Sequence, residues 1–113
     1  MVGRAINDLR RQHGKCAVSM NDFEQNQFCM NHSMAMAERG ELYHADPWLR
    51  GDWAEAVACC SNLDDWGATE HKLIFDLLNG DDAHRSILID TRELAYGMMW
   101  KNNMVYLTVR GRY

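Results

Sequence analysis

Two histidines and two carboxylates are the residues of this chain best suited to chemistry. His44 and His84 each lie where a loop leaves a predicted helix, which is a usual place for a site on a rigid scaffold. Glu55 and Glu70 come between them in the sequence. In one cleft, such a set could orient one another, relay a proton or bind a divalent metal through imidazole. Alternatively, Glu70 stands in the first turn of its helix because the helix dipole favours a carboxylate there.

The other three histidines give weaker evidence for a functional site. None of the five histidines belongs to an HExxH sequence or to a compact Cys/His pair, so spacing alone predicts no zinc motif. We interpret His13 and His71 as solvated residues at a helix end or surface. His32 lies in the middle of a predicted helix, where a structural role is favoured over catalysis.

The four cysteines match neither a zinc ribbon nor a small disulfide framework; they are Cys16, Cys29, Cys59 and Cys60. Adjacent Cα atoms lie about 3.8 Å apart, whereas disulfides prefer roughly 4.4–6.8 Å, so Cys59 and Cys60 could bridge only with strain. We therefore expect free thiols in a reducing compartment. Neither these thiols nor Ser86 stands at a spacing that establishes a nucleophile–base pair.

Length and composition indicate an acidic globular domain. The chain has 113 residues, of which 47% are hydrophobic and 25% charged, which suits one domain with a real core. The net charge of -4 disfavours nonspecific binding to nucleic acid or anionic lipid. No apolar run approaches the ~18 residues of a membrane span, and the charged segment 1–11 does not resemble a signal peptide.

The positioning elements begin with two helices. Apolar spacing predicts a first helix from Val2 that ends near Gly14. A second helix is predicted to begin at Ser19, with Asp22 as the partner of Ser19 in a variant of the capping box, and to end at Gly40. We expect one apolar stripe to face the core from the second helix: Met20, Phe23, Met30, Met34 and Ala37.

The middle of the chain is less regular. Residues 41–65 are predicted to form a long ordered loop with a helical turn near 54–59, and long loops in compact domains are often functional. A third helix begins at Thr69 and ends at Asn79-Gly80, with Asp81 or Asp82 capping a following turn. The apolar residues expected to share a face of this helix are Leu73, Ile74, Leu77 and Leu78.

The C-terminal part changes to an alternating pattern that predicts a hairpin. Asn102-Asn103 suits a two-residue type I′ turn, because asparagine tolerates positive φ. The resulting register sets three apolar pairs on one face: Trp100 with Val105, Met98 with Leu107, and Tyr96 with Val109. Helices followed by a hairpin predict the α+β class, with helices packed on an antiparallel sheet.

Several segments carry a resemblance to a known family. They are INDLRRQHG at 6–14, HSMAMAERGELYH at 32–44, WAEAV at 53–57, DAHRSIL at 82–88, ELAYG at 93–97 and VYLTV at 105–109. In this order, over nearly the whole chain, they resemble the CAP superfamily (cysteine-rich secretory proteins, antigen 5 and pathogenesis-related proteins), and its bacterial SCP-like branch above all. The chain resembles a minimal, divergent member, because the family's disulfides and export signal are absent and its GEN segment is degraded around Glu55.

The resemblance implies one domain, residues 1–113, folded as an α-β-α sandwich whose cleft holds two histidines and two acids. His44, Glu55 and His84 match motif positions. The implied metal ligands are His44 and His84, with zinc or another divalent ion as cofactor. The second acid is Glu70 or Asp76, and Glu70 is preferred because its carboxylate reaches further and it begins a helix.

Three classes of function follow from this comparison. A module that binds a divalent metal, a lipid or sterol, or a protein partner is preferred. A structural or interaction subunit, such as a bacteriophage virion component, is the second class, with aromatic residues at Trp48 and Trp53 as its contacts. A weak protease-like hydrolase that uses the His/Glu cleft is the third. We expect a cytoplasmic location, or a virion if a phage encodes the chain.

Overall fold

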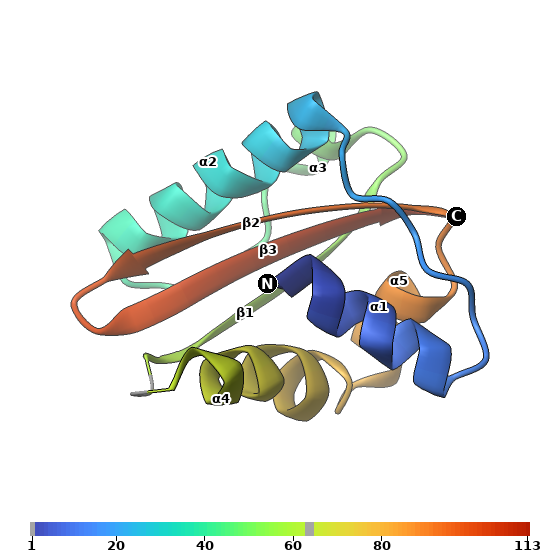
Figure 1. Ribbon diagram of the computed structural model, residues 1–113. Coiled ribbons are helices and arrows are strands. Elements are labelled where there is room, and N and C mark those ends of the chain that lie inside the picture. The colour runs from blue at the N-terminus through green and yellow to red at the C-terminus, as the bar shows by residue number, and fades with distance from the viewer. Residues whose placement is uncertain (1, 63–64) are drawn as a thin grey trace.

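The computed structural model describes residues 2–62 and 65–113 and arranges them in three layers (Figure 1). An antiparallel sheet with the order β1-β3-β2 forms the middle layer. Its strands are β1 (Ala54–Ser61), β2 (Glu93–Lys101) and β3 (Met104–Arg112). The helical elements are α1 (Val2–Gln12), α2 (Phe23–Arg39), α3 (Pro47–Arg50), α4 (Trp66–His71), the π-helix η1 (Lys72–Leu78) and α5 (Asp82–Ile89).

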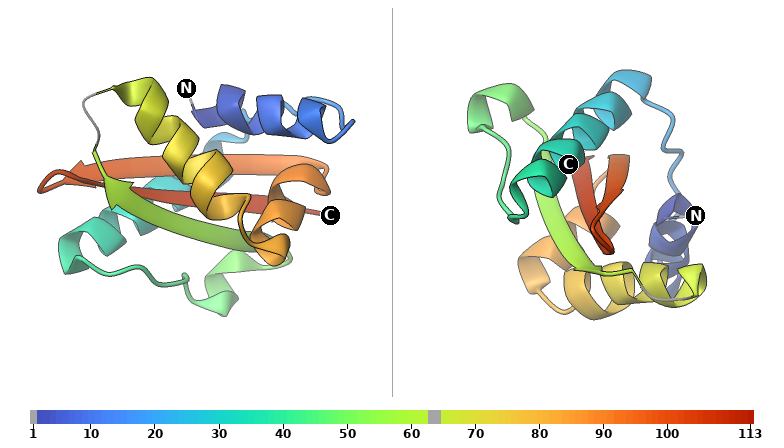
Figure 2. Two further views of the ribbon diagram at one scale, coloured as in Figure 1. Left: turned by 90° about the horizontal axis from the view of Figure 1, so that it is seen from below. Right: turned by 90° about the vertical axis from the view of Figure 1, so that its left-hand side faces the viewer.

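One face of the sheet is covered by α2, and the other by α1, α4, η1 and α5 (Figures 1 and 2). The expected α+β class, the sandwich and the C-terminal hairpin are confirmed. The described residues include no helix long and apolar enough to cross a membrane.

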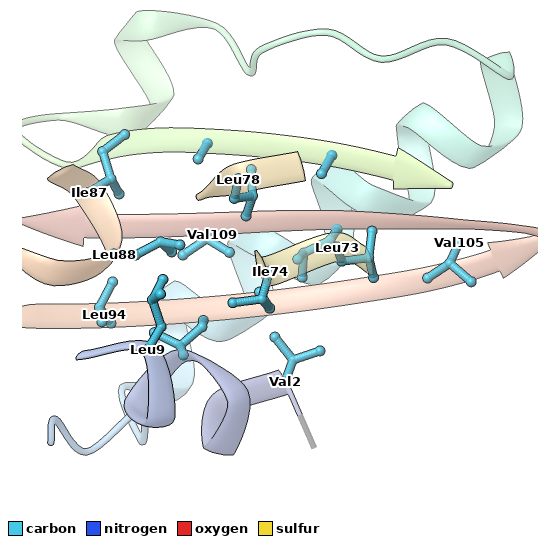
Figure 3. Close-up of a cluster of buried hydrophobic side chains, with 14 residues drawn as sticks. Val2, Leu9, Leu73, Ile74, Leu78, Ile87, Leu88, Leu94, Val105 and Val109 are labelled. Atoms are coloured by element: carbon cyan, nitrogen blue, oxygen red, sulfur yellow. The ribbon is translucent and has the colours of Figure 1, made fainter. Parts of the chain in front are cut away.

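The hairpin follows the predicted register. Asn102 and Asn103 have φ values of 52° and 67°, as a type I′ turn requires. The three apolar pairs face one another as expected, and the β3 members are buried in the main core. That core lies between the sheet and the layer of α1, η1 and α5 (Figure 3). The local turn chemistry therefore sets the register, and with it which side chains of each strand face this core.

The buried face of α2 differs from the predicted stripe. Phe23 is 82% exposed and Met34 is 40% exposed. The buried residues of this helix are Cys29, Ser33, Met36 and Ala37, of which Ala37 belongs to the predicted stripe. The hydroxyl of Ser33 bonds the carbonyl of Gly97 at 2.8 Å and the Thr108 hydroxyl at 2.8 Å, so part of this interface is polar. Counting apolar side chains therefore predicted the buried face of α2 only in part.

The bounds of α2 also differ from the expectation at one end. Its N-cap is Asp22, whose carboxylate accepts the backbone N–H of Gln25 at 3.0 Å, so the helix does not open at Ser19. At the other end, Gly40 has a left-handed φ of 66° and closes the helix as predicted.

The predicted helical turn at 54–59 was wrong, because this segment is strand β1. Pairing with β3 decides its structure: Ala56 and Ala58 enter the main core, while Val57 faces α2. Alanine favours helices in isolation, and this long-range pairing overrides that preference.

The third helix departs from the prediction more modestly. It consists of α4 followed by the π-helix η1. Four of its residues were expected to share a buried face, but one of them, Leu77, is 37% exposed. The wider turn of a π-helix changes which side chains share a face. The following α5 is capped by Asp81, which accepts the backbone N–H of His84 at 3.1 Å.

Candidate functional site

Glu55, near the start of β1, is the centre of a hydrogen-bonded network. Its side chain is fully buried. Oε1 accepts the backbone N–H of Ala45 at 2.8 Å and lies 3.1 Å from Nδ1 of His44. Oε2 lies 3.4 Å from Nε of Arg110. We call these residues the Glu55 network; it ties the loop after α2 to the first residues of β1 and the last residues of β3.

Helix ends on both sides fix the loop that carries His44. Gly40 closes α2, and the carboxylate of Asp46 accepts the backbone N–H of Trp48 to begin α3. Between these points, the bond from Ala45 to Glu55 anchors the backbone. The loop is therefore held close to its tip, and His44 has a defined position.

The network also selects the tautomer of His44. An ionised carboxylate can only accept a hydrogen bond, so Nδ1 of His44 is the donor in this contact. In the neutral ring, Nε2 then carries the free lone pair. Because the side chain is 51% exposed, this nitrogen is available as an acceptor or a metal ligand.

His32 lies beside the network and has a structural role. Its Nε2 lies 2.7 Å from the carbonyl oxygen of Tyr43, so this nitrogen carries the proton and donates it. The same atom is 4.0 Å from Oε1 of Glu55, and the ring packs edge-on against Tyr43. These contacts hold the end of the loop against α2, and they agree with the interpretation drawn from the sequence.

Arg110 is the part of the network that sequence reasoning missed. Its side chain is 1% exposed, lies 3.4 Å from Oε1 of Gln25 and stacks its guanidinium over the ring of Phe28. A signal was present, because Arg110 continues the face of β3 opposite to Val105, Leu107 and Val109. A cation in line with Tyr106 and Thr108, on a strand whose other face is apolar, suggests a partner of opposite charge in the same layer.

The structure brings His44 and Glu55 together, whereas His84 and Glu70 lie on elements of the other helical layer. Glu55 and Val57 point to the α2 face, while α5 packs on the opposite face with Ile87 and Leu88 in the main core. Nδ1 of His84 lies 3.9 Å from the capping carboxylate of Asp81.

The two candidates for the second acid differ in environment. Glu70 is buried on α4. Asp76 is exposed on η1, with a carboxylate oxygen 3.7 Å from Nδ1 of His71. Neither is among the residues named above as the Glu55 network, and the identity of the second acid stays a prediction.

The side chains around Glu55 do not by themselves form a closed metal centre. Within residues 2–62 and 65–113, no group of three or more His, Cys, Asp or Glu side chains could hold a metal ion. Both oxygens of Glu55 already accept hydrogen bonds, one of them from a buried cation. Glu55 therefore fits the role of a residue that orients His44, and not that of a direct ligand.

The nucleophiles that the sequence offered have other environments. The Ser86 hydroxyl lies 2.8 Å from the Tyr113 hydroxyl. Burial raises the pKa of the Cys59 and Cys60 thiols, and it raises the pKa of Cys29 to about 12. Thiols with raised pKa values stay protonated near neutral pH and are weak nucleophiles. Both cysteines of β1 and all other described cysteines are free, as expected.

The two tryptophans proposed as contacts have opposite environments. Trp48 on α3 is 93% exposed, a few residues after His44. Trp53 is 8% exposed, with the guanidinium of Arg112 over its ring at 5.4 Å. Trp48 is therefore available to a partner, whereas Trp53 belongs to the interior.

Comparison with known proteins places the fold. No protein-family model matches the sequence, and no curated protein matches it. Among solved structures, the crystal structure of NaASP2 with Zn²⁺ is similar at a TM-score of 0.69 and 16% identity, over 97% of this chain and 76% of that chain.

Two further structures agree. An outer surface protein from Borrelia burgdorferi has a TM-score of 0.70 and 12% identity, over 98% of this chain and 89% of that one. Venom allergen-like protein 4 from Schistosoma mansoni has a TM-score of 0.54 and 13% identity, over 96% and 86%. Identities this low speak to fold alone. This chain has the CAP-like fold that its sequence motifs predicted.

Proposed function

We propose that this chain is a noncatalytic binding domain in which His44 is the recognising group. The observation that carries the proposal is the orientation of His44 by Glu55, which leaves Nε2 directed away from the network. A buried carboxylate needs well-placed partners, because taking a charge out of water is unfavourable, and here one of those partners is a half-exposed imidazole. An imidazole that is held in this way is suited to bind a ligand through Nε2.

Binding is favoured over hydrolysis by the state of the candidate catalytic groups. A general base must be free to take a proton from a substrate or water. Glu55 already accepts hydrogen bonds from a backbone N–H, an imidazole and a guanidinium. The thiols have raised pKa values, and Ser86 bonds Tyr113 instead of a histidine. These observations support positioning and recognition over turnover.

A zinc ion is the ligand that we propose to test first. Metal-ligating histidines commonly donate their other ring N–H to a carboxylate, as His44 does to Glu55. The similar NaASP2 was crystallised with Zn²⁺. In this chain His44 would be the protein ligand, because His84 lies in the helical layer on the other face of the sheet, and water or groups of a partner would complete the shell. The ion would supply a positive charge that attracts an electron-rich group, and we expect weak affinity because the chain supplies a single ligand.

The surface beside His44 supports a protein partner in addition. Leu42 is 47% exposed and Trp48 is 93% exposed, and both flank His44 in the connection between α2 and β1. Tryptophan is enriched among residues that dominate binding energy at protein interfaces. We infer that a protein docks on this connection and contacts both His44 and Trp48.

A zinc titration followed by thermal unfolding tests the proposal. At a zinc concentration ten times Kd, the stabilisation is about 1.4 kcal/mol, or roughly 5 °C in Tm for a chain of this size. We expect this shift in the unaltered protein and its loss in His44→Ala, whereas His84→Ala, which alters the opposite helical layer, should retain it. His13→Ala, which alters an exposed residue after α1, is the matched control and should retain the shift. A shift that survives His44→Ala, or none in the unaltered protein, would contradict zinc binding at His44.

A further inference from the structure

We propose that three sulfur-bearing side chains at the hairpin end of the sheet bind one soft monovalent metal ion, Cu(I) or its analogue Ag(I). The residues are Cys59 on β1, Met99 on β2 and Met104 on β3, and we call them the sulfur site. The site is separate from His44, and its ligand class differs from that of the proposed zinc ion, so either proposal can fail without the other.

The strand register brings the three side chains to one face. Cys59 and Met99 both pair with Tyr106, one from each side of β3. Met104 lies two residues before Tyr106 and therefore on the same face, diagonal to both. Diagonal positions on antiparallel strands have Cα atoms roughly 7–8 Å apart, within reach of a long side chain. Tyr106 stands between Cys59 and Met99, and Met104, one row closer to the turn, is the diagonal neighbour from which a long side chain can reach toward either sulfur.

Two further contacts support this convergence. The sulfur of Met104 lies 3.9 Å from the Ser61 hydroxyl, so it leans toward β1, where Cys59 is two residues away on the same face. Cys59, Met99 and Met104 all pack against one cluster whose buried members include Met36 of α2. A fourth sulfur-containing side chain therefore lies at the base of the site.

Burial makes the sulfur site both apolar and reachable. Met36 is fully buried, whereas Cys59, Met99 and Met104 are each half-buried and so open to solvent on one side. Thiolate and thioether are soft ligands, which select Cu(I) over hard ions that prefer oxygen. On binding, the ion forms a bond to the Cys59 sulfur and the thiol proton passes to solvent. Copper remains Cu(I), so the step needs neither oxidant nor reductant.

The chain contains its own control in the neighbouring cysteine. Cys60 points to the opposite face of β1, where it pairs with Val105 and packs with the main core. Its exposure is of the same class as that of Cys59, and burial raises the pKa of both thiols. The two cysteines thus differ in the face of the sheet on which they lie, and only Cys59 shares its face with Met99 and Met104. If methionines only fill irregular gaps in the packing, the two thiols should bind copper equally.

The test is a Cu(I) competition titration on the full chain under anaerobic reducing conditions. The competitor is a chromophoric Cu(I) chelator that binds the ion more tightly than a single thiol does. All variants carry Cys16→Ser as background, because the exposed thiol of Cys16 could bind copper by itself. We expect one ion per chain, with an affinity that falls at least about tenfold in Cys59→Ser and in Met104→Leu, since each removes a ligand. Cys60→Ser should bind as the background protein does. Equal losses in Cys59→Ser and Cys60→Ser would overturn the proposal.

A second readout keeps the proposal testable if Cys59→Ser unfolds. Met104→Leu nearly conserves volume at a half-buried position, so it should fold. In spectra of methyl-labelled methionine, addition of Cu(I) should shift the signals of Met99 and Met104 and leave that of exposed Met34 in place. Unchanged affinity in Met104→Leu, or binding without these shifts, would show coordination by a thiol alone and would contradict the site.

Discussion

Gly97→Ala should destabilise the protein by at least about 3 kcal/mol, a loss in the range of severe core overpacking. A Cβ atom at Gly97 would lie 2.3 Å from the backbone nitrogen of Met30, 2.6 Å from its Cα and 2.8 Å from the carbonyl carbon of Cys29. These are backbone atoms of α2 and cannot rotate away as a side chain could. The helix would have to lift from the sheet, and the bond from Ser33 to the Gly97 carbonyl would be strained. Urea unfolding measures the loss.

The matched control is Gly67→Ala, near the start of α4. There the nearest atom to an added Cβ is a carboxylate oxygen of Asp65 at 3.5 Å, an ordinary contact. Replacing glycine by alanine within a helix is favourable by up to about 1 kcal/mol, so this variant should be neutral or slightly more stable. If Gly97→Ala cost no more than about 1 kcal/mol, α2 would not lie as close to β2 as described.

Glu55→Ala is expected to cost about 3–5 kcal/mol, the usual result of removing one partner of a buried ion pair. The change takes from Arg110 the carboxylate that faces its buried guanidinium, and it removes the acceptor for the Ala45 N–H and for His44. The loop after α2 should loosen together with the start of β1. Chemical denaturation gives the cost, and amide exchange at Ala45 should become faster.

An exposed ion pair provides the comparison. Glu93 bonds Arg112, and both side chains are close to half exposed. Glu93→Ala should therefore cost no more than about 1 kcal/mol, as surface pairs usually do. Combining Glu55→Leu with Arg110→Met should recover much of the stability lost in Glu55→Ala, since apolar residues of similar volume often replace a buried pair well. Equal costs for Glu55→Ala and Glu93→Ala would show that Glu55 is not the hub of the loop.

Features fixed by local chemistry could be predicted from the sequence. The Asn102-Asn103 turn needs two residues that tolerate positive φ, and this local requirement determined the register of the whole hairpin. Gly40 closes α2 for a similar reason. Such signals depend on nearest neighbours along the chain, so they remain readable without a structure.

Features fixed by long-range contacts could not be predicted in the same way. The stretch 54–61 resembles a helical turn until β3 pairs with it, and that partner lies more than 40 residues later. The buried face of α2 depends on Gly97 and on the polar bonds of Ser33, which no count of apolar residues along the helix reveals.

The candidate site likewise has some features that could be predicted from the sequence and others that could not. His44 and Glu55 were expected to meet because both match family motifs, and they lie 3.1 Å apart. The backbone N–H of Ala45 completes the network, but a backbone group leaves no trace in the sequence. Glu55 could be named as the partner of Arg110 only once the sheet order, which places β3 beside β1, was known.

The protonation of the His44 ring tests the account most directly. Nitrogen-15 NMR of the labelled protein, at a pH where the ring is neutral, distinguishes a proton on Nδ1 from one on Nε2. We predict the proton on Nδ1, donated to Glu55, and a bare Nε2 that faces the ligand. A neutral ring with its proton mainly on Nε2 would mean that Glu55 does not orient His44, and the proposed recognition by this residue would lose its basis.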